Sequence, residues 1–235
     1  MLYTDYLTIM SFGFVLGLRH ALDADHLAAV STILAQRPTW RASSLVGLSW
    51  GIGHTFVLLC MGAVVLLLGI RIPEPVAVAA EFTVGVMLVL LGGHLGLRLL
   101  KERWHVHGHD HDGRRHVHFH SHAVTADHGH LHWLQDSIRP LCVGMAHGLA
   151  GSTGLLLIVV ASSYSVLEGL GFIAVFGIGS IAGMMLIGLA MSVPVIWSQS
   201  NGRSAFLTVQ AVASVGSVAI GLWMIIRITM TGQPS

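Results

Sequence analysis

The sequence carries little charge. Only 10% of its 235 residues are Asp, Glu, Lys or Arg, whereas 54% are hydrophobic. A soluble domain carries about 25% charged residues, so the composition excludes a disordered chain and argues against a water-soluble enzyme. Twelve Lys and Arg nearly balance eleven Asp and Glu. This balance excludes the basic field through which proteins bind nucleic acid, so we expect no nucleic-acid partner.

Cysteine and the common catalytic motifs are also scarce. Cys60 and Cys142 lie in separate apolar segments and form neither a CxxC metal site nor a disulfide framework. We interpret both as buried packing residues. The sequence has no HExxH and no GxSxG motif, which argues against a membrane-embedded metalloenzyme. It has no GxxxxGK[ST] loop, so an ATPase acting with this chain would be a separate protein.

Long apolar runs dominate the chain. A membrane-spanning helix needs about 20 mostly apolar residues, and six stretches qualify. They are Tyr6–Val30, Ser44–Ile70, Val76–Leu100, Ile138–Ser163, Glu168–Ile196 and Ala205–Ile228. The sequence therefore predicts an all-α integral membrane protein with six transmembrane helices, whose environment is the lipid bilayer.

The orientation follows from the Lys and Arg residues between these stretches, because cytoplasmic loops are enriched in them. The cytoplasmic set, with the N-terminus outside, is Arg37, Arg41, Arg98, Lys101, Arg103, Arg114, Arg115, Arg139 and Arg203, and the outer set is Arg71 and Arg227. The tryptophans near the predicted cytoplasmic ends, as in an aromatic belt, are Trp40, Trp50, Trp104, Trp133 and Trp197. We expect both termini outside.

The two halves of the chain resemble each other. Gly17–Leu22 matches Gly144–Leu149 at an offset of 127, and Trp50–His54 matches Phe176–Ser180 at an offset of 126. A weaker third match pairs Gly92 and Arg98 with Gly221 and Arg227 at an offset of 129. The alternative is that glycine-rich helices match by chance.

Three matches in order predict a duplicated three-helix unit. The first repeat would cover residues 1–100, a histidine-rich cytoplasmic loop 101–137, and the second repeat 138–235. An odd number of helices inverts the second copy in the membrane. Inverted repeats are typical of secondary transporters, whose substrate site lies near the midplane between the halves.

The first apolar stretch contains an unusual charged cluster. An Arg or Asp at a helix centre costs about 2.5–3.5 kcal/mol on insertion, so Arg19, Asp23 and Asp25 would together cost about 8–10 kcal/mol if unpaired. Arg19 and Asp23 are four residues apart and can form a structural ion pair along the helix. That pair leaves His20, Asp25 and His26 unexplained.

The positions of these residues around a regular helix separate them. Arg19, His20, Asp23 and His26 fall on one face, and Asp25 falls on another. His20, Asp23 and His26 form a polar stripe about 9 Å long. Imidazoles at the two ends of the stripe reach a common ion only if the helix bends or unwinds. We expect Asp25 to pair with another helix or to cap one.

Two further histidines match this cluster in depth. His20, His54 and His147 are all predicted within about 5 Å of the bilayer midplane. Three neutral imidazoles and a carboxylate form a ligand set for nickel, copper, zinc or cobalt(II), and no thiolate is placed to favour copper(I). The alternative is that each histidine is a hydrogen-bonded packing residue.

The segment Arg19–His26, RHALDADH, closely resembles the signature helix of the nickel/cobalt transporter family (NiCoT, within the wider NicO group), whose motif has the form RHA-x-DADH. Gly53–Thr55 resembles the family's second motif, GHS/T. The segment Val143–Ser152 departs from the acidic LGFDT-type motif of other members and is similar to the short six-helix, urease-linked branch.

The resemblance implies a transporter of nickel or cobalt(II) in the cytoplasmic (inner) membrane of a prokaryote, with no resident cofactor. It implies that His20, Asp23, Asp25 and His26 are needed for transport, and we add His54 and His147 to the metal ligands. Possible partners are a cytoplasmic nickel chaperone or the urease maturation machinery. The departure in Val143–Ser152 leaves the choice between the two metals open.

A histidine-rich segment joins the two halves. The residues concerned are His105, His107, His109, His111, His116, His118, His120, His122, His128, His130 and His132. Such tracts commonly bind metal, and this one is too polar and short to form a core. We predict secondary metal buffering or transfer on the cytoplasmic side, the alternative being a soluble tether.

The sequence thus favours a secondary transporter that imports nickel or cobalt(II) by alternating access of its two halves. Two alternatives within transport are an efflux protein and the membrane subunit of an ATP-driven importer.

Overall fold

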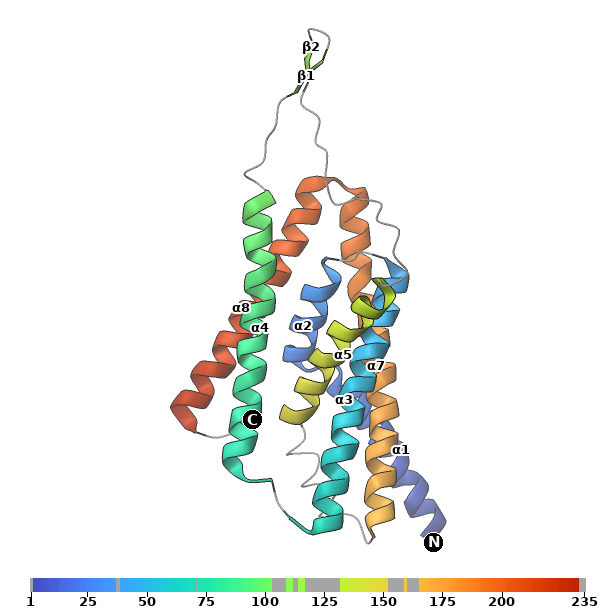
Figure 1. The fold of residues 1–235 in the computed structure, drawn as a ribbon. Coiled ribbons are helices and arrows are strands. Elements are labelled where there is room, and N and C mark those ends of the chain that lie inside the picture. Colours follow the sequence, from blue (N-terminus) through green and yellow to red (C-terminus); the bar gives the residue numbers. More distant parts are fainter. Residues whose placement is uncertain are drawn as a thin grey trace.

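The computed structural model describes residues 2–36, 39–70, 72–102, 109–111, 114–116, 132–151, 159 and 165–232. The helices that it describes are α1 (Leu2–His20), α2 (Ala24–Leu34), α3 (Trp40–Leu68), α4 (Glu74–Glu102), α5 (His132–Ala150), α7 (Val166–Ser200) and α8 (Arg203–Thr231). They form an elongated bundle in which α2 and α5 lie inside a frame of longer helices (Figure 1).

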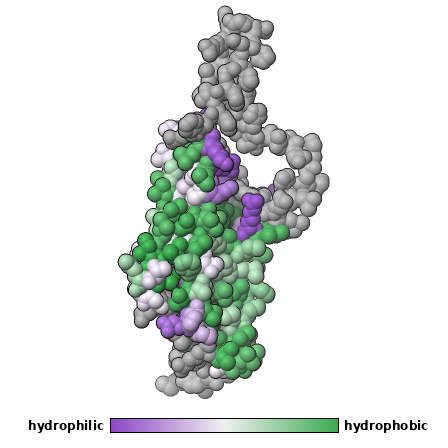
Figure 2. Space-filling model, turned by 60° about the vertical axis from the view of Figure 1, so that its left-hand side comes forward, coloured by the Kyte–Doolittle hydropathy of each residue, from purple (hydrophilic) through white to green (hydrophobic). Residues whose placement is uncertain are grey.

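Four of the described helices are long and apolar enough to cross a membrane, namely α3, α4, α7 and α8. They confirm four of the six predicted spans, with slightly wider bounds. Apolar side chains cover most of the described surface on the face that Figure 2 shows, and hydrophilic residues gather toward its two ends. The chain is a multi-pass membrane protein.

The first predicted span, Tyr6–Val30, is not one helix. It consists of α1 and α2, which are separated at Ala21–Asp23. Asp23 has an extended backbone, with φ −61° and ψ 144°, and its amide donates to the carbonyl of His20 over 3.1 Å. The polar cluster therefore lies where the backbone is unwound. The sequence predicted that His20 and His26 could share an ion only if the helix unwinds in this way.

The fourth predicted span, Ile138–Ser163, is described only in part. Its helix α5 begins at His132 and ends at Ala150. Most of the remainder lies outside the described residues.

Helices α1 and α5 contact their neighbours backbone to backbone. A Cβ atom on Gly17 of α1 would overlap the carbonyl oxygen of Phe176 in α7. Likewise, a Cβ atom on Gly144 of α5 would overlap the carbonyl oxygen of Trp50 in α3. Small residues at helix contacts are how membrane helices approach closely, because lipid supplies no hydrophobic driving force between them. Gly17 and Gly144 therefore serve packing.

Helices α4 and α8 form a second close pair. Ser214 and Ser217 of α8 donate hydrogen bonds of 2.8 Å and 2.9 Å to the carbonyl oxygens of Gly92 and Leu88 in α4. Near the other end, the guanidinium of Arg227 donates to the buried carboxylate of Glu81 over 3.0 Å. These polar contacts join the two helices along most of their length.

The histidine-rich segment includes two short strands, β1 (His109–His111) and β2 (Arg114–His116), which pair antiparallel with His109 opposite His116. This hairpin is an addition to the all-α prediction. His132 is the first residue of α5. The predicted buffering residues that lie outside the described part of the chain are His105, His107, His118, His120, His122, His128 and His130.

The interpretation of the two cysteines as buried is wrong. Cys60 on α3 and Cys142 on α5 are both free thiols with exposed side chains. Each is apolar enough to face lipid, so its position in an apolar segment did not reveal which side of the helix it occupies.

We expect Gly144→Ala to destabilise the protein by about 1–3 kcal/mol, because the new methyl group must push α5 away from the Trp50 carbonyl. The measurement is the Tm of the purified protein in detergent. Gly93→Ala on α4 is the matched control, since a Cβ atom there meets nothing within 4 Å. Equal Tm values for the two variants would contradict the packing argument.

Candidate metal site

The predicted ligands come from four helices and from the break between α1 and α2. His20 ends α1, Asp23 lies in the break, and Asp25 and His26 are in the first turn of α2. His54 lies at the middle of α3 and His147 in the last turn of α5. Tertiary packing brings the four imidazoles and the Asp25 carboxylate together, although more than 120 residues separate the first of them from the last.

His26 is at the centre of this cluster. Its ring centroid lies 4.8 Å from that of His20, 5.5 Å from that of His54 and 4.7 Å from that of His147. The rings of His20 and His54 are 5.1 Å apart. No other described side chain contacts as many of the predicted ligands by its ring.

The donor atoms form two groups that share His26. One group is His20, His26 and His54, and the other is Asp25, His26 and His147; within each, the donor atoms lie within 4.8 Å of one another. An imidazole nitrogen lies about 2.0–2.1 Å from a zinc-sized divalent ion, so two donors to one ion lie about 3–4 Å apart. Each group therefore fits one ion after adjustments of about 1 Å.

Asp25 orients the second group. Its Oδ1 accepts the His26 backbone N–H over 2.9 Å and lies 3.1 Å from His26 Nδ1. Its Oδ2 lies 3.5 Å from His147 Nε2. A carboxylate on Nδ1 directs the other imidazole nitrogen, Nε2, toward a ligand. Asp25 thus pairs with another helix, as its position on a regular helix indicated.

Several ring nitrogens are buried without a hydrogen-bond partner in the described part of the protein. They are Nε2 of His26, both ring nitrogens of His54, and Nε2 of His147 beyond its contact with Asp25. His26, His54 and His147 are at most 2% exposed. Since an unpaired buried polar atom costs free energy, these nitrogens favour a ligand role over simple packing.

Two helix C-termini meet at the site. Helix α1 ends at His20 and α5 ends at Ala150, one residue before Gly151, whose added Cβ would lie 3.3 Å from the His20 ring. The C-terminal end of a helix carries a partial negative charge, which favours a cation. The N-terminal end of α2 carries the opposite partial charge, and Asp25 in its first turn offsets it.

The predicted ion pair between Arg19 and Asp23 is wrong. No ion pair joins them among the residues that the structure describes; Asp23 instead accepts from His20, with Oδ2 2.8 Å from Nδ1. The helix ends at His20, so the i,i+4 geometry that the pair requires is lost. Arg19 and Asp23 are both exposed, and Asp23 belongs to neither ligand group.

Trp50 was assigned to the aromatic belt, and this assignment is wrong. Its side chain is fully buried, with its ring 5.0 Å from that of His147 and 6.1 Å from that of His26. The indole N–H has no partner among the described residues. One sequence signal could have found it, because Trp50 precedes His54 by one helical turn and so shares its face.

Comparisons with known proteins show which family the chain belongs to. A family model described as the cytochrome c biogenesis protein transmembrane region matches residues 9–231. The urease accessory protein UreH of Bacillus sp. (strain TB-90) is 36% identical over 208 residues, which cover 87% of this chain and 86% of that protein. No solved structure matches. The chain belongs to the family of the cytochrome c biogenesis protein transmembrane region and is a homologue of the urease accessory protein UreH.

Proposed function

We propose that this protein is a secondary transporter that imports Ni²⁺, or Co²⁺, across the cytoplasmic membrane through the His/Asp site. One observation carries the proposal: three buried histidines from three different helices, His26, His54 and His147, lie together, and each has a ring nitrogen without a hydrogen-bond partner among the described residues. The transported ion is substrate, and no step requires a resident cofactor.

The chemistry of the site supports a borderline divalent metal. An ion that leaves water must receive replacement ligands, since burying an uncompensated charge is costly. Neutral imidazoles suit nickel, cobalt(II), copper and zinc, whereas magnesium or calcium would need more oxygen ligands. The Asp25 carboxylate offsets part of the ion's charge. The homology to a urease accessory protein favours nickel, with the urease maturation machinery or a cytoplasmic nickel chaperone as recipient.

The two ligand groups suggest how the ion moves. An ion held by His20, His26 and His54 can pass to Asp25, His26 and His147 while His26 remains bound. Such a transfer never leaves the ion without protein ligands in the membrane. It also gives His26 a role that no other ligand shares.

We assign the architecture to two inverted three-helix repeats, residues 1–100 and 138–235, joined by the histidine-rich loop. Paired contacts support this assignment. Gly17 meets the Phe176 carbonyl just as Gly144 meets the Trp50 carbonyl. The two glycines are 127 residues apart and the two carbonyls 126 residues apart, which are the offsets of the sequence matches.

A second set of contacts supports the same exchange of halves. A Cβ atom on Gly92 would lie 2.6 Å from the Ser214 carbonyl, and one on Gly221 would lie 2.5 Å from the Gly85 carbonyl. The two glycines, Gly92 and Gly221, are 129 residues apart, and so are the two carbonyls, those of Gly85 and Ser214. An inverted repeat allows one half to rock against the other around a central site. The positions of the Lys and Arg residues favour an orientation with both termini outside and with the histidine-rich loop, as a metal buffer, in the cytoplasm.

We expect cells that produce the protein to accumulate more radiolabelled nickel than empty cells, and His20→Ala and His26→Ala to return accumulation to the empty-cell level. Thr83→Ala, an exposed change on α4, is the control at equal membrane expression. Accumulation below that of empty cells would instead indicate efflux. No difference for nickel or cobalt would contradict transport by this chain alone and point to a missing ATPase partner.

The two neighbouring aspartates provide a sharper test of the site. Asp25 contacts two imidazoles, whereas the Asp23 side chain is 54% exposed and contacts one imidazole among the described residues, that of His20. Asp25→Asn should weaken Ni²⁺ binding by about 10–100-fold, as loss of a ligand-orienting partner does, and Asp23→Asn should weaken it less. Isothermal titration of the purified variants measures both affinities. The reverse order would refute the assignment of Asp25 to the ligand group.

A further inference from the structure

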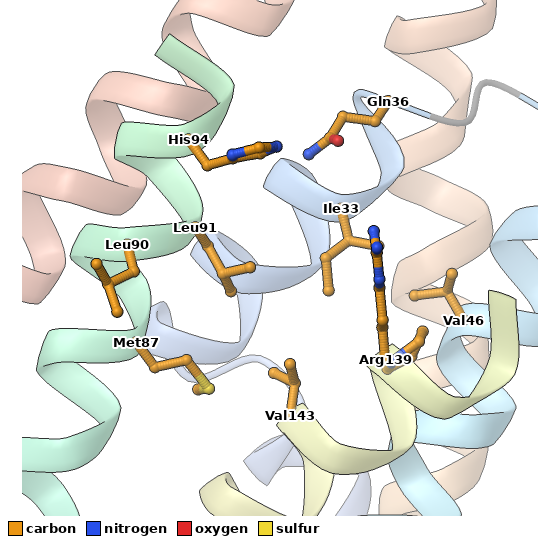
Figure 3. A pocket seen from close by; sticks show the side chains of 10 residues that line it. Ile33, Gln36, Val46, Met87, Leu90, Leu91, His94, Arg139 and Val143 are labelled. Carbon is orange, nitrogen blue, oxygen red and sulfur yellow. The ribbon is translucent and has the colours of Figure 1, made fainter. Parts of the chain in front are cut away.

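A pocket of about 250 Å³ lies between α2, α3, α4 and α5. Its polar residues are Gln36, which follows the end of α2, His94 of α4 and Arg139 of α5. In Figure 3 the side chains of His94 and Gln36 point toward each other at one end, and Arg139 extends its guanidinium toward that end. The rest of the lining is mainly apolar and includes Val46, Met87, Leu91 and Val143.

The walls of this pocket continue into the metal site. On α5, Arg139, Val143 and His147 follow one another at intervals of four residues, as do Val46, Trp50 and His54 on α3. Residues four apart lie on one helix face, about 6 Å apart along the axis. On α3, the pocket-lining residue Val46 is therefore one helical turn from Trp50, which is one turn from the ligand His54 on the same helix face.

One layer separates the pocket from the ligands. The Trp50 ring lies beside those of His147 and His26, with centroids 5.0 Å and 6.1 Å away, and is 0% exposed; the Val143 carbonyl lies 3.3 Å from His147 Nδ1. A hydrated divalent ion does not enter an apolar constriction that excludes water. Trp50 and Val143 thus close the path between the pocket and the site.

Exposure differs between the two sides of the site. His54 and His147, on the helices that carry the closing layer, are 0% and 1% exposed. By contrast, His20 and Asp23 at the α1–α2 break have 18% and 54% of their side chains exposed. The cluster is therefore more exposed at His20 and Asp23 than at the histidines of α3 and α5.

We propose that this pocket is the inner vestibule for a hydrated divalent cation and that Trp50 is the gate between the vestibule and the His/Asp site. This inference rests on the proposed transport function. The Gln36 carbonyl and the His94 imidazole are neutral groups that can hydrogen-bond the water shell of the ion or replace part of it. The Arg139 guanidinium disfavours a long residence of the cation and so favours its release.

Trp50 suits a gate because nothing but packing fixes its ring. Its indole N–H makes no hydrogen bond among the described residues, so rotation of the ring breaks none. Its backbone, in contrast, is held against Gly144 of α5. The side chain can therefore move while the helix pair stays in place.

The vestibule is tested by thiol labelling in the full-length protein. The background is Cys60→Ser with Cys142→Ser, which removes both native thiols, and the reporter is His94→Cys. A membrane-impermeant methanethiosulfonate reagent should label the reporter in inside-out vesicles but not in intact cells. Labelling only from outside, or from neither side, would overturn the vestibule. This readout does not depend on transport, so it stands apart from failure of the proposed function.

The gate is tested by metal flux from proteoliposomes loaded with Ni²⁺. Trp50→Ala should release the metal about tenfold faster than the unmodified protein, which corresponds to about 1.4 kcal/mol. Trp197→Ala, which removes an exposed tryptophan of α7, is the matched control. Equal release by the two variants would overturn the gate.

A smaller aromatic variant separates gating from a loss of folding. Trp50→Phe keeps a ring in the layer and should release Ni²⁺ at an intermediate rate, with a Tm near that of the unmodified protein. If Trp50→Ala does not fold, the comparison of Trp50→Phe with Trp197→Phe replaces it. Release by Trp50→Phe no faster than by that control would then refute the gate. Absence of flux in the unmodified protein refutes transport itself.

Discussion

The contact between α5 and α3 is the constraint on which the rest of the site depends. Gly144 lies against the Trp50 carbonyl, and a Cβ atom on Gly148 would lie 2.6 Å from the His54 carbonyl. With any larger residue the two helices would stand further apart, and His147 would lose its contact with the cluster. Backbone contact between helices is thus what lets short imidazole side chains meet around one ion in a membrane.

The break in the first span is the second requirement. In a continuous helix His20 and His26 would lie about 9 Å apart along the axis, whereas their rings are 4.8 Å apart across the break. Unwound backbone is tolerated at membrane depth only where protein surrounds it or a cavity is present. Here it also leaves the C-terminal end of α1 at the site, where its partial negative charge favours a cation.

The sequence predicted which polar side chains lie together better than it predicted their neighbours. Ionisable groups at midplane depth are costly enough to suggest a function, so Asp25 and the four histidines could be singled out without coordinates. Packing partners gave no such signal. Trp50 suits a membrane interface as well as a protein core, and Cys60 and Cys142 suit lipid as well as protein, so composition could not place any of these three.

Local rules also failed where the helix was assumed to continue. The pair of Arg19 and Asp23 required an unbroken turn, and the chain unwinds at that turn. The break at Ala21, Leu22 and Asp23 contains no proline or glycine. Since a helix accepts all three residues, the local sequence does not signal the break. Contacts with the rest of the bundle must therefore produce it.

The sequence by itself determined the membrane character, four of the spans and the candidate ligands of the proposed metal site. Hydropathy and the cost of intramembrane charge are properties of the residues themselves, so no neighbour is needed to infer them. Only the tertiary structure decided how the ligands divide into two groups around His26 and what closes the site. Those features depend on which helix faces meet, and that choice is made by glycine contacts between segments more than 90 residues apart.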